Sequence, residues 1–173
     1  MAPRLPDTID EKLFGLYLSD HLTGATAGLA RIDRMSDDFT DTPVHAELAR
    51  IGSEIRGERS LLRALIHDLG LRQRPYRQAA SWLLERVGRL KLNGRIFNRS
   101  PLTLVLEAEL MRSAIMGKFG LWQTLEDRAA EIGLDPARFA DLARQAQDQL
   151  AALERVHAYA RATGFRAQDN ARS

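Results

Sequence analysis

Apolar residues recur at alternating steps of three and four along most of the chain, and this spacing restricts it to long amphipathic helices. One such run extends from Val44 to Leu69, and another extends from Phe139 to Ala160. Steps of three and four place side chains on one side of an α-helix, where they can be buried against neighbouring helices. The sequence therefore predicts an all-α protein.

Helix ends are marked by cap residues, prolines and glycines. Three segments begin with a residue suited to the N-cap followed by proline: Thr42-Pro43, Ser100-Pro101 and Asp135-Pro136. Gly70 and Gly133 follow apolar runs and suit the left-handed residue that ends a helix. Together these signals predict four helices, over residues 9–36, 43–69, 101–132 and 136–163.

The lengths of the links predict how the helices are connected. Links of about five residues join the first helix to the second and the third to the fourth, so each pair should form an antiparallel hairpin. The link over 70–100 is long enough to return along the bundle, and it contains a predicted short helix at about 77–92. We expect one domain over 1–173, an antiparallel four-helix bundle with a long crossover. Residues 166–173 are predicted to form a disordered tail.

The third predicted helix is apolar on two faces. One face holds Leu104, Ala108, Met111, Ile115, Phe119 and Trp122, and the other holds Leu102, Leu106, Leu110, Gly117 and Leu121. A helix that is apolar on two faces should be buried on two sides. The second face could be covered by the crossover or by another subunit, and on this basis we predict a homodimer.

A few polar residues fall on or beside the apolar stripes. Glu58 and His157 lie within them, and His21 lies close to one. Glu154, Glu107 and Glu109 lie on the flanks, and Asp20 points away. Counting from the turns places His21, Glu58, His157 and Glu109 in one layer. A buried carboxylate requires a partner, so these groups either satisfy one another, bind a metal ion, or leave Glu58 exposed or paired with an arginine.

Two hairpins joined by one crossover, with acidic residues and histidines inside, resemble the ferritin-like superfamily. That resemblance implies a di-iron centre with one glutamate from each of two helices and a Glu-x-x-His pair from each of the other two. The fourth helix has such a pair in Glu154 and His157. The second helix has Glu58, but Leu61 stands where the histidine belongs. The third helix offers Glu109 or Glu107, and the first offers His21 or Asp20.

The sequence leaves two main hypotheses for function. The first is a non-enzymatic ferritin-like bundle that acts by binding a partner, with an incomplete ligand set and no cofactor. The second is a protein that binds iron, manganese or zinc through Glu58, Glu109, Glu154, His157 and His21. The chain has no cysteine, which excludes disulfides and thiolate chemistry. It also shows no catalytic triad, phosphate-binding loop or dinucleotide fingerprint, so we assign no catalytic residue.

The crossover carries most of the positive charge. Between residues 72 and 99 there are eight basic residues and one acidic residue, Glu85, so this stretch is +7 and the remainder is −5. The stretch is either the solvated face of a helix or a docking surface for an acidic protein, membrane headgroups or nucleic acid. The residues assigned to this docking surface are Trp82, Arg86, Arg89, Lys91 and Arg95. With aromatic residues at only 6% of the chain, nucleic acid is the least favoured partner.

Localisation is predicted from what the sequence lacks. No apolar run approaches the ~20 residues of a membrane-spanning helix. The first residues lack the apolar core of a secretory signal. We therefore expect a cytoplasmic protein.

Overall fold

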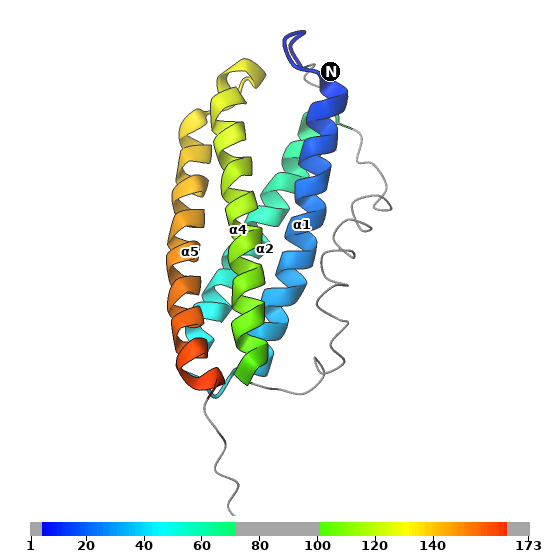
Figure 1. Cartoon of the computed structure of the whole chain (residues 1–173). Helices are drawn as coiled ribbons and strands as arrows, with labels where there is room; N and C mark the ends of the chain where they lie inside the picture. The colour runs from blue at the N-terminus through cyan, green and yellow to red at the C-terminus, as the bar shows by residue number, and fades with distance from the viewer. Residues whose placement is uncertain (1–4, 72–100, 166–173) are drawn as a thin grey trace, which may run out of the picture.

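The structure, a computed structural model, describes residues 5–71 and 101–165, and this part of the chain is almost entirely helical (Figure 1). Its α-helices are α1 (Glu11–Asp38), α2 (His45–Asp68), α4 (Pro101–Ala129) and α5 (Pro136–Gly164), and a 3-10 turn (Ala130–Ile132) extends α4. The all-α prediction is confirmed, with bounds within about two residues of those expected. The predicted helix at 77–92 and the predicted tail at 166–173 lie outside the described residues.

The helices form two hairpins that pack into a bundle. α1 packs against α2, and α4 packs against α5; the hairpins meet mainly along α1 and α4, whereas α2 and α5 touch sparsely. Each helix runs antiparallel to both of its neighbours (Figure 1). Leu71 lies against Gly15 near the start of α1, and α4 begins at the opposite end of the bundle. The segment 72–100 therefore joins opposite ends, as expected of a crossover.

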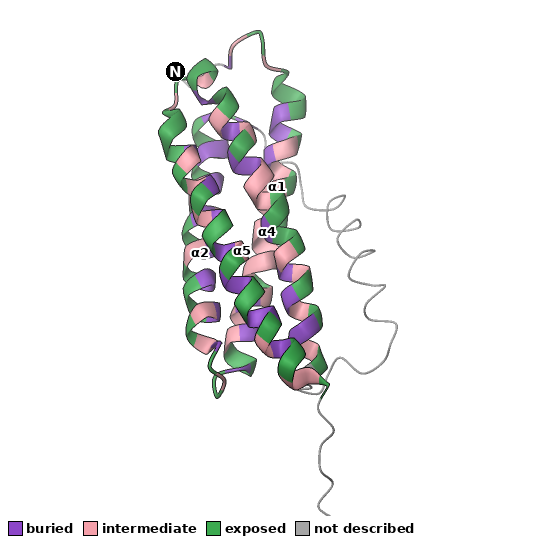
Figure 2. Cartoon of the chain, turned by 60° about the vertical axis from the view of Figure 1, so that its left-hand side comes forward, coloured by how far each residue is buried: buried purple, intermediate pink, exposed green. Residues whose placement is uncertain are grey.

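The core lies where the apolar spacing placed it (Figure 2). Every residue of the predicted α2 stripe is buried: Val44, Leu48, Ile51, Ile55, Glu58, Leu62, Leu65 and Leu69. The predicted α5 stripe is also buried, except for the half-buried Leu150. The apolar stripe of α1 extends from Phe14 to Met35. It is buried towards both ends of the helix, but its middle, from His21 to Leu29, is mostly half-buried.

The helix ends follow the sequence signals at Gly70, Gly133 and Asp135 but not at Thr42, and the predicted cap at Ser100 lies outside the described residues. Asp135 accepts a hydrogen bond from the Ala137 amide at 3.0 Å, and Gly70 and Gly133 have φ of 67° and 73°. The prediction that Thr42 caps the second helix is wrong. α2 begins at His45 without a side-chain cap, and the Thr42 hydroxyl donates to the Phe39 carbonyl at 2.6 Å. The hydroxyl is used to close the link between α1 and α2.

The helical glycines differ in the space around them. A Cβ at Gly52 would lie 3.1 Å from Asp33 Oδ1, because α1 and α2 approach closely there. Five other helical glycines would place a Cβ with no neighbouring atom within 4 Å: Gly24, Gly28, Gly57, Gly117 and Gly120. None of the described helices is long and apolar enough to cross a membrane.

Candidate functional site

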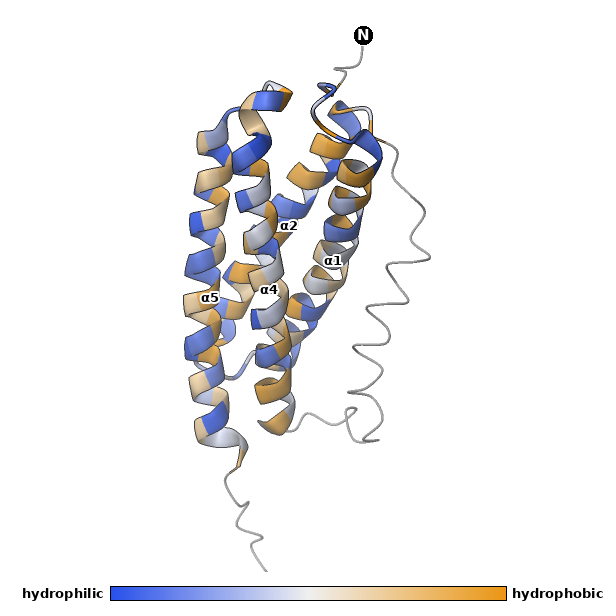
Figure 3. Cartoon of the chain, turned by 45° about the horizontal axis from the view of Figure 1, so that its top comes forward, coloured by the Kyte–Doolittle hydropathy of each residue, from blue (hydrophilic) through white to orange (hydrophobic). Residues whose placement is uncertain are grey.

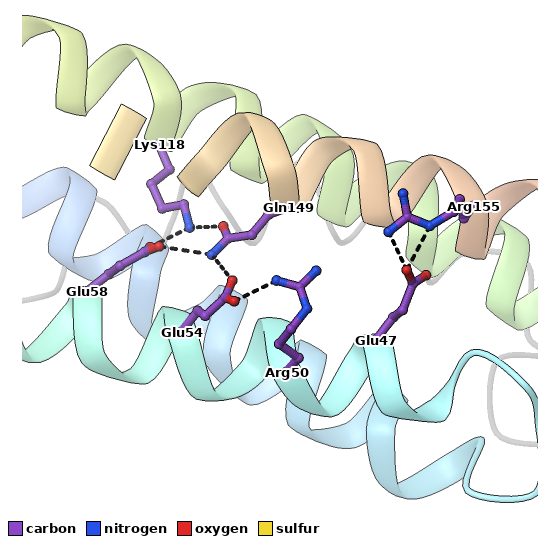
Figure 4. Close-up of polar contacts among 7 residues, drawn as sticks. All are labelled: Glu47, Arg50, Glu54, Glu58, Lys118, Gln149 and Arg155. Atoms are coloured by element: carbon purple, nitrogen blue, oxygen red, sulfur yellow. Dashed lines mark hydrogen bonds and ion pairs between the residues drawn. The ribbon is translucent and has the colours of Figure 1, made fainter. Parts of the chain in front are cut away.

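Four polar residues from three helices meet inside the bundle, and we call them the Lys118 cluster. They are Glu54 and Glu58 of α2, Lys118 of α4 and Gln149 of α5 (Figure 4). Glu58 is 4% exposed and Gln149 is fully buried, while the Lys118 side chain is 12% exposed. Such groups can be buried only if they are bound to one another.

Every carboxylate oxygen in the Lys118 cluster accepts a hydrogen bond. Lys118 Nζ donates to Glu58 Oε2 and to Gln149 Oε1. Gln149 Nε2 donates to Glu58 Oε1 at 3.0 Å and to Glu54 Oε2 at 2.8 Å. Glu54 Oε1 accepts from Arg50 Nη1 at 2.6 Å. The cluster thus contains two carboxylates, one ammonium group and one amide that bridges the carboxylates, and Arg50 binds Glu54 from outside the cluster.

Burial also affects the lysine itself. Removal of the ammonium group from water lowers the pKa of Lys118, and the charges of Glu58 and Glu54 oppose that shift. Burial therefore removes hydration that stabilises the charged ammonium group, and the contacts with the carboxylates partly replace that stabilisation.

A second group of polar residues, which we call the His157 cluster, lies between α4 and α5. His157 is buried, and its Nε2 lies 3.1 Å from Glu109 Oε1. Its Nδ1 lies 3.2 Å from Arg112 Nη1, and Arg112 Nη2 lies 2.6 Å from Glu154 Oε2. Because a guanidinium can only donate, Nδ1 is the accepting nitrogen and Nε2 carries the proton donated to Glu109. Both ring nitrogens are therefore occupied.

His21 stands apart from both clusters. Its ring meets Tyr17 edge-on, with 4.6 Å between the ring centroids. Burial lowers the pKa of His21, and the neighbouring Asp20 opposes the shift. Asp20 itself is exposed, as expected.

The structure confirms that Glu58 and His157 point inward, but it separates them. Glu58 contacts Gln149, which lies eight residues before His157 on α5, a separation of about 12 Å along the helix. His157 and Glu109, which the sequence placed in the same layer, are in contact. The predicted single layer is replaced by two clusters.

Sequence reasoning missed Lys118 and Gln149, although a signal for both existed. Lys118 is three residues after Ile115 and four before Trp122, and Gln149 has the same spacing between Ala146 and Leu153. Both therefore fall on core-facing positions of their helices.

We tested whether these residues fit the di-iron centre implied by the ferritin-like resemblance. Within residues 5–71 and 101–165, no three His, Asp or Glu side chains form a group that could hold a metal ion. Glu58 is bound by a lysine, and His157 has an arginine on one nitrogen. The donors are also divided between two clusters. These residues do not fit a di-iron centre.

An open groove runs beside the Lys118 cluster where α2 and α5 diverge. Its volume is about 540 Å³, and Glu54 links it to the cluster. The groove is lined by Glu54, Leu61, Arg138, Asp141, Leu142, Arg144, Gln145 and Asp148. Charges of both signs are mixed along it, so it does not select a ligand of one charge.

The predicted docking residues Trp82, Arg86, Arg89, Lys91 and Arg95 lie outside the described part of the chain. Their role stays a prediction. No known protein family, curated protein or solved structure matches this chain.

Proposed function

We propose that this protein is a ferritin-like helical bundle that acts without catalysis, by binding a partner along the outer face of α4. The observation that carries the proposal is the scarcity of charged residues on that face. Seven residues of α4 between 102 and 117 are exposed, and Glu109 is the one charged residue among them. Glu109 is engaged by His157.

The apolar side chains of this face are large and open to water. Leu102, Leu106 and Met116 are 43%, 38% and 56% exposed, and the first turns of α4 are strongly apolar in Figure 3. The solvent side of a bundle helix normally carries charged residues, and contiguous apolar surface marks an interaction site. We define the α4 outer face as Leu102, Leu106, Ser113, Met116 and Gly117.

The proposed partner is a second copy of the chain, giving a homodimer. A face whose one exposed charged residue, Glu109, is already engaged by His157 offers little to an ionic partner, whereas two identical, mainly apolar faces can pack on each other about a two-fold axis. Ser113 and Gly117 are small residues, which would let two α4 helices approach closely.

Mass determination by light scattering tests this proposal. We expect the wild type to be a dimer and Leu106→Glu to be a monomer with unchanged helical circular dichroism. Leu13→Glu is the matched control, because Leu13 is 62% exposed on α1 near the opposite end of the bundle. A monomeric wild type, or a Leu106→Glu variant that remains dimeric, would contradict the dimer.

The metal-binding alternative has its own test, because a histidine and a carboxylate already touch in the His157 cluster. Protein purified without chelators should contain less than one iron, manganese or zinc ion per chain. A stoichiometric metal that disappears in Glu58→Ala and His157→Ala would replace the non-catalytic proposal with a metal-binding one.

Binding of anionic surfaces through 72–99 is tested by neutralising Arg86, Arg89 and Lys91, which should flatten the salt dependence of any such binding.

A further inference from the structure

Two oxygen atoms from different helices converge on one positive centre in the Lys118 cluster. Glu58 Oε2 comes from α2 and Gln149 Oε1 from α5, and both contact Lys118 Nζ from α4 (Figure 4). A third oxygen, on Glu54, is held nearby by Gln149 Nε2. Convergence of carboxylate and amide oxygens on one point is the arrangement that surrounds a hard metal ion in proteins.

The positive charge at that point is supplied by the chain. Arg50 binds Glu54 on the outer side of the cluster. The cationic side chain that contacts the buried Glu58 is Lys118. A carboxylate that is almost fully removed from water needs such a charge beside it. The cluster therefore brings a carboxylate oxygen and an amide oxygen to one side-chain cation, with the Glu54 carboxylate beside them.

We infer that the ammonium group of Lys118 is the resident cation of a divalent-metal site, and that removal of this group opens the site to a hard divalent ion. This inference accounts for the disagreement with the ferritin-like ligand set: Glu58, which that resemblance assigns to a metal, is neutralised by a lysine. The oxygen ligands would be Glu58, Glu54 and Gln149.

The chemistry of the ligands selects the class of ion. Carboxylate and amide oxygens suit magnesium, calcium and manganese, whereas zinc and copper favour the nitrogen and sulfur ligands that this cluster lacks. Manganese is the useful probe, because its paramagnetism reports binding directly.

The test compares Mn²⁺ binding by four full-length proteins, using isothermal titration calorimetry and electron paramagnetic resonance. They are the wild type, Lys118→Ala, Lys118→Met and the double variant Glu58→Gln/Lys118→Ala. Alanine removes both the charge and the bulk of the lysine, whereas methionine removes the charge and still fills the space. Lys118→Met is therefore the matched control for lost charge alone.

We expect Lys118→Ala to bind one Mn²⁺ per chain at least about tenfold more tightly than the wild type. The gain should be absent in Lys118→Met and lost again in the double variant. A folded Lys118→Ala protein that binds Mn²⁺ no more tightly than the wild type overturns the inference. So does a gain that persists without the Glu58 carboxylate.

Loss of the lysine could also unfold the metal-free protein, and that case is tested by circular dichroism. Addition of Mn²⁺ should then restore the helical signal of Lys118→Ala but not that of the double variant. If Mn²⁺ restores neither protein, the site does not accept a metal ion and the inference is wrong.

Discussion

Glu58 lies inside the bundle with one oxygen bound by Lys118 and the other by Gln149. Both partners come from the opposite hairpin, so this single residue ties α2 to α4 and α5 at once. A buried ion pair contributes less to stability than its contacts suggest, because both groups lose their hydration. Loss of one member alone is costly, since the other is left buried without a counter-charge.

This asymmetry gives a prediction for Glu58→Gln and Lys118→Met. Each single substitution should lower the free energy of unfolding by about 3 kcal/mol, and the double substitution should cost clearly less than the two together. Urea unfolding followed by circular dichroism measures the cycle. The control is Asp141→Asn, whose exposed pair with Arg144 should contribute less than about 1 kcal/mol. Additive losses at Glu58 and Lys118 would show that the two residues are not coupled.

His21 gives a prediction for the effect of pH. Its pKa in the folded protein lies below the ordinary value of 6.5, so the unfolded chain binds more protons just below that pH. Stability should therefore fall as the pH drops below 6.5, by at most about 1.4 kcal/mol per pH unit from this residue. His21→Gln should flatten the dependence in urea titrations at several pH values. His67→Gln, on the surface, controls for loss of a histidine, and an equal effect of both would contradict the prediction.

The spacing of apolar residues was enough to place Glu58 and His157 in the core but not to identify their partners. On α5, Gln149 and Leu150 both continue a pattern of threes and fours, and periodicity alone favoured the leucine. The structure buries Gln149 fully and leaves Leu150 half-buried. Gln149 is buried because it bonds to Glu58 and Lys118 on other helices. The sequence of α5 alone does not contain that information.

At the scale of the element, helix ends were predictable where the cap works locally. Asp135 is followed directly by Pro136 and the Ala137 amide, so the sequence contains the whole interaction. Thr42 has the same local signal, but in the tight link its hydroxyl donates to the Phe39 carbonyl and the helix begins only at His45. The start of α2 therefore depended on the geometry of the hairpin turn, which the cap signal does not describe.

The glycines inside the helices give a prediction at this scale. Gly24→Ala and Gly120→Ala should each raise the free energy of unfolding by up to about 1 kcal/mol, because alanine favours helix and meets no neighbour at these sites. Thermal or urea unfolding measures the gain. Gly52→Ala is the contrast, since its Cβ would press on Asp33, and Gly133→Ala should destabilise because of its positive φ. A loss of stability at Gly24 and Gly120 would contradict the packing described here.

At the scale of the whole molecule, the heights of residues along the bundle were predicted correctly within the α4–α5 hairpin, but not within the α1–α2 hairpin or between the two hairpins. Counting from the first turn set His21 level with Glu58, whereas Arg59 contacts Thr26 and Gly52 lies against Asp33, so His21 lies further along the bundle than Glu58.

Counting from the turn between α4 and α5 correctly set His157 beside Glu109. No short turn connects the two hairpins, so their relative height could not be counted from the sequence. The prediction that Glu58 and His157 lie at the same height was therefore wrong. Because the hairpins are joined only through 72–100, their relative height depends on packing and on contacts such as Lys118 with Glu58.

The uneven burial of α1 predicts uneven protection from hydrogen exchange. Residues 21–30 of α1 are half-buried or exposed, whereas α2 from Ile51 to Ile66 carries a continuous buried stripe. Segments with little buried contact open locally at lower free energy. Exchange followed by mass spectrometry should therefore show faster deuteration in residues 21–30 than in 51–66. Equal rates in the two segments would mean that the bundle opens only as a whole.

The alternation of helix direction around the bundle also limits the electric field of the backbone. Among the described helices, α1 and α5 begin at the end of the bundle where α2 and α4 finish, so partial positive and negative charges of the helix dipoles lie side by side at each end. Long-range attraction between the described bundle and a charged molecule therefore comes mainly from charged side chains rather than from the helix dipoles.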